Sequence, residues 1–129
     1  MARSVINSPS SPSPIGPYSH AVEVKSHQRM IFTSGQVALN AETGAMVQDS
    51  IAAETKQVME NLEKILVSAG VDFAHVVKST IFLTNLDDFA EVNDVYGQFF
   101  ENDYPARETV QVVRLPRNAR VEISMIAAV

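Results

Sequence analysis

Apolar and polar residues repeat with two different periods along the chain, and these periods predict an ordered series of strands and helices. Near the N-terminus, the rough alternation over 18–24 and the apolar start of 30–37 predict two antiparallel strands. Apolar residues then recur at spacings of three and four over 51–69, which is the period of a helix that buries one face. Either Asp49 or Ser50 can accept hydrogen bonds as the N-cap of this helix.

The second half of the chain predicts three more strands and one more helix. Segment 75–83 is rich in β-branched residues and apolar on much of both faces, which is typical of a central strand. An apolar stripe over 86–100 predicts a second helix, for which Asn85 is the candidate N-cap. Two final strands are predicted over 109–114 and 121–128, with a turn between them.

The order of these elements, β-β-α-β-α-β-β, predicts an α+β fold in which two helices cover one face of a single mixed sheet. Residues 15–129 are expected to form one domain, whereas residues 1–14 end in the Ser/Pro run NSPSSPSP and are expected to form a flexible arm. The second face of the sheet carries apolar residues that the two helices cannot also cover. We therefore expect a homo-oligomer.

Composition restricts the classes of function. With 129 residues, 46% of them hydrophobic and 19% charged, the chain has the composition of one globular domain. It contains no cysteine, which excludes disulfides and thiolate chemistry, and its three histidines lack the spacings that place two imidazoles on one metal. The net charge of -5 opposes a nucleic-acid partner. No apolar run approaches the roughly 20 residues that cross a bilayer, so we expect a cytoplasmic protein without a membrane partner.

Two charged residues lie in otherwise apolar surroundings and are candidates for chemistry. Glu122 is placed inside the last predicted strand, and Arg107 follows the short Pro-Ala sequence before the preceding strand. Each also has a structural interpretation: Glu122 can face solvent on the outer side of its strand. Arg107 can form an ordinary ion pair with Glu108, Asp103 or Glu101. Taken singly, each residue favours its structural interpretation.

Several motifs taken together, in order, resemble the RidA/YjgF family of reactive-intermediate deaminases. The resemblance runs from residue 15 to residue 128 and rests on six segments: IGPYSHAV, MIFTSGQV, TNLDDFAEVNDVYGQFF, YPARETVQV, RLP and VEISMIA. It implies a chorismate-mutase-like α+β fold assembled as a homotrimer, with a site in each cleft between subunits.

The resemblance also implies roles for individual residues. Arg107 matches the arginine that binds the substrate carboxylate, and Glu122 matches the glutamate that positions the hydrolytic water. Six further matches are expected to line the cleft and bind substrate: Tyr18, Ser34, Gly35, Phe89, Asn93 and Thr109. The implied activity is that of a 2-iminobutanoate/2-iminopropanoate deaminase, which hydrolyses 2-aminoacrylate or 2-iminobutyrate to a 2-keto acid and ammonia. This hydrolysis needs only positioning and one acid/base group, so no cofactor is expected.

Three positions depart from the pattern of the family. Thr109 stands where many members have cysteine, and Ser124 stands where many have a second glutamate. Glu108 directly follows Arg107 and could compete for the guanidinium, but neighbouring side chains of a strand point to opposite faces, so Glu108 is expected to turn away.

Two other classes of function stay open. A non-catalytic module that binds small carboxylates or other proteins is one, although the presence of both Arg107 and Glu122 favours catalysis. A ribonuclease or translation inhibitor of the RidA type is the other. The acidic charge opposes it, and its basic patch would consist of Arg114, Arg117 and Arg120 around one turn.

Overall fold

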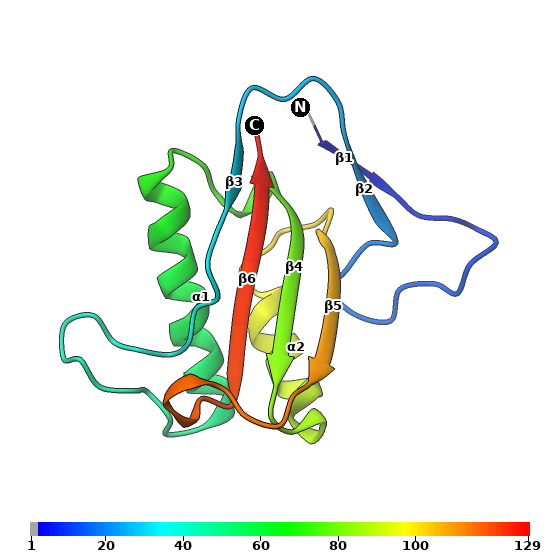
Figure 1. Ribbon diagram of the computed structural model, residues 1–129. Coiled ribbons are helices and arrows are strands. Elements are labelled where there is room, and N and C mark those ends of the chain that lie inside the picture. Colours follow the sequence, from blue (N-terminus) through cyan, green and yellow to red (C-terminus); the bar gives the residue numbers. More distant parts are fainter. Residues whose placement is uncertain (1–2) are drawn as a thin grey trace.

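The computed structural model describes residues 3–129, which form two α-helices, a four-stranded sheet and a two-stranded sheet (Figure 1). The larger sheet has the strand order β3 (Met30–Phe32), β6 (Val121–Ala128), β4 (Val76–Leu83) and β5 (Ala106–Gln111). Strands β4 and β5 are parallel, and the other neighbours are antiparallel. The sheet is therefore mixed, as predicted.

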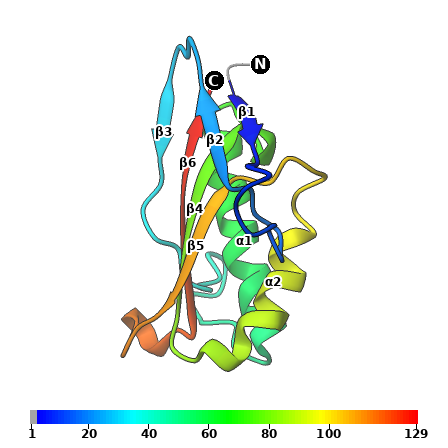
Figure 2. The same ribbon diagram turned by 90° about the vertical axis from the view of Figure 1, so that its right-hand side faces the viewer.

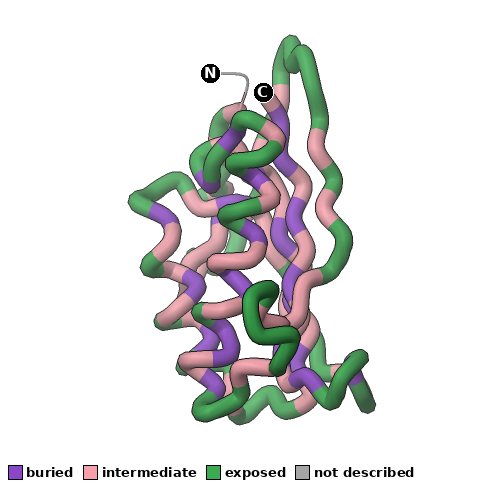
Figure 3. Tube along the Cα trace, turned by 90° about the vertical axis from the view of Figure 1, so that its left-hand side faces the viewer, coloured by how far each residue is buried: buried purple, intermediate pink, exposed green. Residues whose placement is uncertain are grey.

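Both helices, α1 (Ile51–Ser68) and α2 (Phe89–Gly97), lie on the same face of this sheet (Figure 2). Buried residues concentrate where helices and strands face one another (Figure 3). The centre of the core includes six side chains that are at most 1% exposed: Val58, Leu62, Leu66, Ile81, Ile123 and Met125. The predicted α+β arrangement, with two helices on one face, is confirmed.

Helix α1 begins where the sequence predicts. Ser50 has extended backbone angles, and its side-chain oxygen accepts a hydrogen bond from the Ala53 N–H at 3.0 Å, so Ser50 is the N-cap. The helix ends before Gly70, whose positive φ of 75° turns the chain away. Within residues 3–129, no helix is long and apolar enough to cross a membrane.

The N-terminal strands pair differently from the prediction. Strand β2 (Ala21–Val24) pairs with β1 (Arg3–Ile6) in a separate antiparallel sheet, and not with β3. The expected pairing of 18–24 with 30–37 in one sheet was therefore wrong. Arg3 Nε donates a hydrogen bond to the Val76 carbonyl at 3.0 Å, which attaches this two-stranded ribbon beside β4.

Part of the Ser/Pro segment is attached to the fold through His20. The Nδ1 atom of His20 accepts a hydrogen bond from the Ser8 N–H at 2.8 Å, and its Nε2 atom lies 2.5 Å from the Pro12 carbonyl oxygen. Strand β1 lies within the predicted arm of residues 1–14, so this arm contains regular structure that the sequence did not indicate. The division into residues 1–14 and 15–129 stays a prediction.

Two elements have other boundaries in the structure than in the prediction, and both differences affect the site. Strand β5 begins at Ala106, three residues before the predicted start, so Arg107 lies inside the strand. The predicted second helix begins with a 3-10 turn at Leu86–Asp88 and continues as α2. Asn85 caps this turn as expected, since its side-chain oxygen accepts a hydrogen bond from the Asp87 N–H at 2.9 Å.

Candidate functional site

Arg107 points toward the helices from strand β5. It lies in register with Ser79 of the parallel neighbour β4, and residues in register on neighbouring strands share a face of the sheet. Ser79 is fully buried, and its Oγ accepts a hydrogen bond from the Tyr96 hydroxyl of α2 at 2.9 Å. The Arg107 side chain therefore lies between the edge strand and α2.

Three aromatic rings and one amide surround the Arg107 guanidinium. Its central carbon lies 5.5 Å from the ring centroid of Tyr18, 5.7 Å from that of Phe89 and 5.2 Å from that of Tyr96. Cation-π attraction holds a guanidinium at such distances. Its Nη1 donates a short hydrogen bond of 2.6 Å to Asn93 Oδ1.

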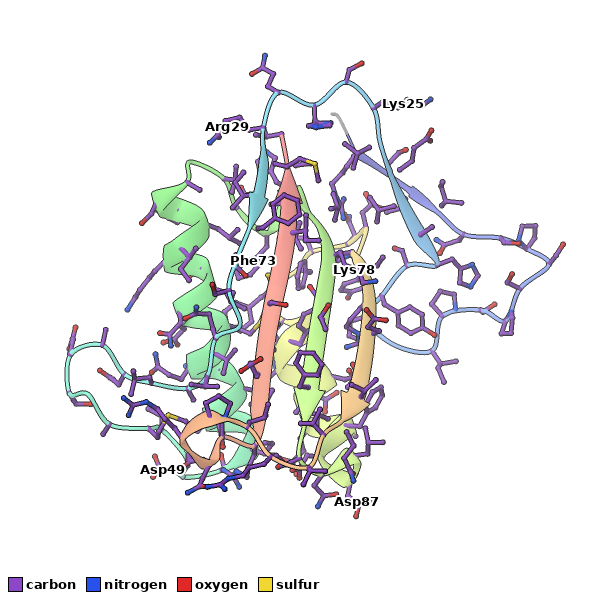
Figure 4. The ribbon with its side chains drawn as sticks, viewed as in Figure 1. Lys25, Arg29, Asp49, Phe73, Lys78 and Asp87 are labelled. Atoms are coloured by element: carbon purple, nitrogen blue, oxygen red, sulfur yellow. The ribbon has the colours of Figure 1, made fainter. Side chains whose placement is uncertain are left out.

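The positive charge of Arg107 has no carboxylate partner within residues 3–129. The neighbouring Glu108 points to the opposite face, where its carboxylate lies 3.3 Å from Lys78 Nζ. Figure 4 shows Lys78 near β5 at the upper part of the sheet. The prediction that Glu108 turns away from the guanidinium is confirmed.

Because the Arg107 guanidinium is partly buried and lacks a charged partner among the described residues, binding of an anion to it is favourable. Desolvation lowers the pKa of Arg107, while the Tyr96 and Tyr18 hydroxyls act in the opposite direction. Burial also raises the pKa of Tyr96 to about 12, so this phenol is neutral near pH 7 and does not neutralise the guanidinium. A carboxylate that binds here would pair with a partly desolvated cation through charge-assisted hydrogen bonds.

Gly16 leaves a space next to Arg107. A Cβ atom added to Gly16 would lie 3.6 Å from Arg107 Nη2 and also 3.6 Å from Asn93 Nδ2. Neither nitrogen has a hydrogen-bond partner among the described residues. Gly16 and Asn93 also line an open groove of about 540 Å³ between the Ile15–Pro17 segment and helix α2.

Glu122 lies on the other face of the sheet. It is in register with Phe82 of β4, whereas its neighbour Ile123 is fully buried on the helix side. Its carboxylate lies against the backbone of Gly35, since a Cβ atom on Gly35 would be only 2.6 Å from Glu122 Oε2. Ser34 and Gly35 are both exposed, so Ser34, Gly35 and Glu122 form a second group of predicted residues.

Thr109 lies between two polar contacts of β5 with the start and middle of the α2 region. Arg107 bonds to Asn93 on one side, and Gln111 Oε1 accepts a hydrogen bond from the Leu86 N–H at 2.9 Å on the other. The Oγ1 atom of Thr109 is buried and has no hydrogen-bond partner, the one such side-chain atom found within residues 3–129. The expected binding of substrate by Thr109 stays a prediction.

The predicted site residues therefore fall into two groups. Tyr18, Phe89, Asn93 and Arg107 meet on the helix side with Thr109 next to them, and Ser34, Gly35 and Glu122 meet on the opposite side. One chain alone does not bring Arg107 and Glu122 together. The sequence reasoning missed Tyr96, which it assigned only to the apolar stripe of a helix, and Gly16, which it noted only as part of a motif.

Two further expectations concern metals and the basic turn. No group of three or more His, Asp or Glu side chains within residues 3–129 is arranged to hold a metal ion. Of the three arginines near the turn before β6, Arg120 is paired with the buried Glu54 at 2.7 Å. Of the predicted basic patch, only Arg114 and Arg117 have no carboxylate partner among residues 3–129.

Comparison with known proteins gives close relatives over nearly the whole chain. The family described as "Endoribonuclease L-PSP" matches residues 8–129. Protein DfrA from Myxococcus xanthus is 53% identical over 127 residues, which cover 98% of this chain and 96% of that protein. The 2-iminobutanoate/2-iminopropanoate deaminase of Bos taurus is 44% identical over 127 residues, which cover 98% of this chain and 90% of that enzyme. Among solved structures, YyfB of the conserved Rid protein family from Yersinia pestis superposes with a TM-score of 0.87 at 33% identity, with 100% of both chains covered.

Proposed function

The chain belongs to the YjgF/RidA family, the family described as Endoribonuclease L-PSP, and we propose that it hydrolyses reactive 2-enamine and 2-imino acids to 2-keto acids and ammonia. Relatives from several animals that are 42–46% identical carry the name 2-iminobutanoate/2-iminopropanoate deaminase. The reaction is metabolite damage control, since the imines arise from other enzymes. Action in the cytoplasm is part of the same proposal.

The observation that carries the proposal is the unpaired guanidinium of Arg107. A partly buried cation without a carboxylate partner among residues 3–129 is unfavourable for the free protein, and a substrate carboxylate would relieve this. Asn93 and the rings of Tyr18, Phe89 and Tyr96 hold the planar group in one orientation. A fixed guanidinium can donate two parallel hydrogen bonds to one carboxylate.

The proposed reaction is a hydrolysis with one positioned acid/base group. Arg107 binds the carboxylate of the 2-imino acid, and a water held by Glu122 adds to C2 of the protonated C=N bond. The resulting carbinolamine then expels its nitrogen as ammonia, and C2 becomes the carbonyl carbon of the 2-keto acid. Water supplies the oxygen, and Glu122 takes a proton from the water and returns it to the nitrogen, which leaves with the electron pair of the C–N bond. C2 is neither oxidised nor reduced, so the reaction needs no redox cofactor.

The proposed site combines two copies of the chain. Arg107 and Glu122 lie on opposite faces of the sheet, so the Arg107 of one copy would meet the Ser34-Gly35-Glu122 group of another. The face that carries Glu122 also exposes apolar side chains, including Phe32 at 68% and Val110 at 44%, which a second copy would cover. A homotrimer, as the family resemblance implies, closes such contacts into a ring.

Arg107→Ala and Glu122→Gln test this function directly. We expect wild type to accelerate release of ammonia and keto acid from enzymatically generated 2-aminoacrylate and 2-iminobutyrate, and both variants to lose that acceleration. Glu108→Gln is the matched control, because it makes the same change on an exposed carboxylate paired with Lys78. It should retain the wild-type rate.

Two results would point elsewhere. If wild type binds keto acids but does not accelerate the reaction above the spontaneous rate, the protein is a carboxylate-binding module and not an enzyme. Equal losses in Glu108→Gln and Glu122→Gln would remove the specific role of Glu122 and leave only a general effect of charge.

A further inference from the structure

We propose that the groove along α2 binds the side chain of the substrate, so that the protein prefers 2-imino and 2-keto acids whose apolar side chain is longer than that of 2-oxobutanoate. This inference rests on the proposed function, because it takes Arg107 as the anchor of the carboxylate. It extends that function by assigning the class of side chain and the surface that selects it.

Two free donors lie beside Gly16 at one end of the groove: Asn93, which lines the groove, and Arg107, which does not line it but lies next to Gly16. Arg107 Nη2 and Asn93 Nδ2 both face the space above Gly16, at 3.6 Å from the point where a Cβ atom would be. Neither nitrogen is committed elsewhere within residues 3–129, because Asn93 bonds to the guanidinium through its oxygen. An anion near Gly16 can therefore accept from both groups, which fixes the end from which the ligand extends.

The groove continues from this point along one face of α2. Its helix side runs from Ala90 to Gln98, which at 1.5 Å per residue is about 12 Å. A four-carbon acid in extended form is only about 5 Å long. The volume of about 540 Å³ thus leaves room beyond C4 of a ligand whose carboxylate lies at Arg107.

The walls of the groove favour an apolar, uncharged side chain. Ile15 is 92% exposed at its edge, and Pro17, Ala90 and Gly97 supply further apolar surface. An aliphatic side chain would cover this surface and release its water. Asp94 also lines the groove, so a second carboxylate on the ligand would meet a negative charge.

Calorimetric titration of the purified protein with 2-keto acids of increasing length tests the inference. We expect 2-oxohexanoate to bind about five- to fifteenfold more tightly than 2-oxobutanoate, since each buried methylene contributes up to about fourfold. The dicarboxylic 2-oxoglutarate should bind less tightly than 2-oxopentanoate, which has the same number of carbons.

Ala90→Leu and Glu91→Leu form the matched pair of variants. Both place leucine on an exposed position of α2, where leucine is a good helix former, but only Ala90 lines the groove. Ala90→Leu should remove the advantage of the six-carbon acid, and Glu91→Leu should keep it. Gly16→Ala should instead weaken both acids alike, because its methyl group would occupy the space between the two donors.

The outcomes separate this inference from the proposed function. If 2-oxobutanoate binds and Arg107→Ala abolishes that binding, but affinity does not rise with chain length or Ala90→Leu keeps the rise, the groove is not the side-chain site. If no keto acid binds, or Arg107→Ala leaves binding intact, the carboxylate anchor itself is wrong and the proposed function fails with it.

Discussion

Two glycines control how closely other groups approach the two charged residues of the proposed site. At Gly35 the Glu122 carboxylate occupies the space of a side chain, since a Cβ atom would lie 2.6 Å from Oε2 and 2.7 Å from Cδ. At Gly16 a Cβ atom would fit, in ordinary van der Waals contact at 3.6 Å with Arg107 Nη2 and Asn93 Nδ2. Substitution by alanine should therefore displace the Glu122 carboxylate at Gly35, and add a methyl group without a clash at Gly16.

Gly35→Ala should inactivate the protein without unfolding it. The added methyl group pushes Glu122 out of its position, and the loss of a positioned acid/base group lowers kcat by about 10²-fold or more. Steady-state kinetics beside a thermal melt would show a large loss in rate with little change in Tm. In the double variant Gly35→Ala/Glu122→Asp, the shorter carboxylate should fit beside the methyl group and restore part of the rate. A single variant as active as wild type would contradict the role given to this contact.

The sequence predicted the neighbours of Arg107 better than it predicted the arrangement of the whole candidate site. Asn93 and Phe89 were expected near Arg107, and both contact its guanidinium. The opposite-face placement of Arg107 and Glu122 was not foreseen, because β5 was predicted to begin at Thr109. The alternation of faces along a strand separated Glu108 from Arg107, but it did not relate Arg107 to Glu122, because the register of β5, β4 and β6 is a long-range property.

At the scale of elements, a buried ion pair attaches the turn before β6 to helix α1. Glu54 is 0% exposed and accepts hydrogen bonds from the backbone N–H of Arg120 at 2.8 Å and from its Nε at 2.7 Å. Arg120 Nη2 also donates to the Gln48 carbonyl at 3.0 Å. These contacts fix the entry into β6, and with it the position of Glu122 two residues later.

Glu54→Gln should destabilise the fold by about 1–3 kcal/mol, because the buried oxygens lose a charge-assisted contact while Arg120 remains partly solvated. Urea denaturation monitored by circular dichroism measures this change. Glu60→Gln is the control on the same helix. Its partner Lys56 is exposed and 3.9 Å away, so the free energy of unfolding should change by less than about 0.5 kcal/mol. Equal effects of the two substitutions would show that the buried pair adds nothing specific.

Contact with the core explains why the last strand was predicted well and the first strands were not. Strand β6 runs over 121–128 in both the prediction and the structure, since its alternation of buried and half-buried residues is set by the core on one side. Strand β2 has no such core beneath it and alternates only between exposed and half-buried positions. Its partner is decided by long-range contacts such as that of Arg3 with Val76, which local pattern does not contain.

At the scale of the whole molecule, the uncovered face of the sheet is the surface on which copies would meet. Phe32 is 68% exposed there, in register with Ile126 of β6. Phe32→Glu should keep the chain folded, because the Phe32 side chain is not part of the core and its removal creates no cavity in a single chain. It should nevertheless dissociate the oligomer and abolish activity. Light scattering after size exclusion measures the mass, and an active variant of unchanged mass would contradict the assembly proposed.

Mixing two inactive variants tests whether each site takes residues from two copies. If Arg107→Ala and Glu122→Gln chains are denatured together in equal amounts and refolded, mixed trimers should each contain one site with both residues intact. Random assembly then restores about one quarter of the wild-type activity. Each variant refolded alone should stay inactive. No recovery in mixed assemblies of the correct mass would mean that both residues act within one chain.

The unpartnered hydroxyl of Thr109 affects how this position can change over evolutionary time. A buried Oγ1 without a hydrogen bond adds nothing to the stability of the free fold, so valine or cysteine can fill the same volume without a penalty. A lineage can therefore exchange threonine for cysteine here without passing through an unstable intermediate. Each such exchange places a thiol two residues from a guanidinium, whose positive charge favours the thiolate, at a position where burial shields the sulfur from oxidants. The presence of a thiol is thus a property that this fold can gain or lose by neutral drift at one site.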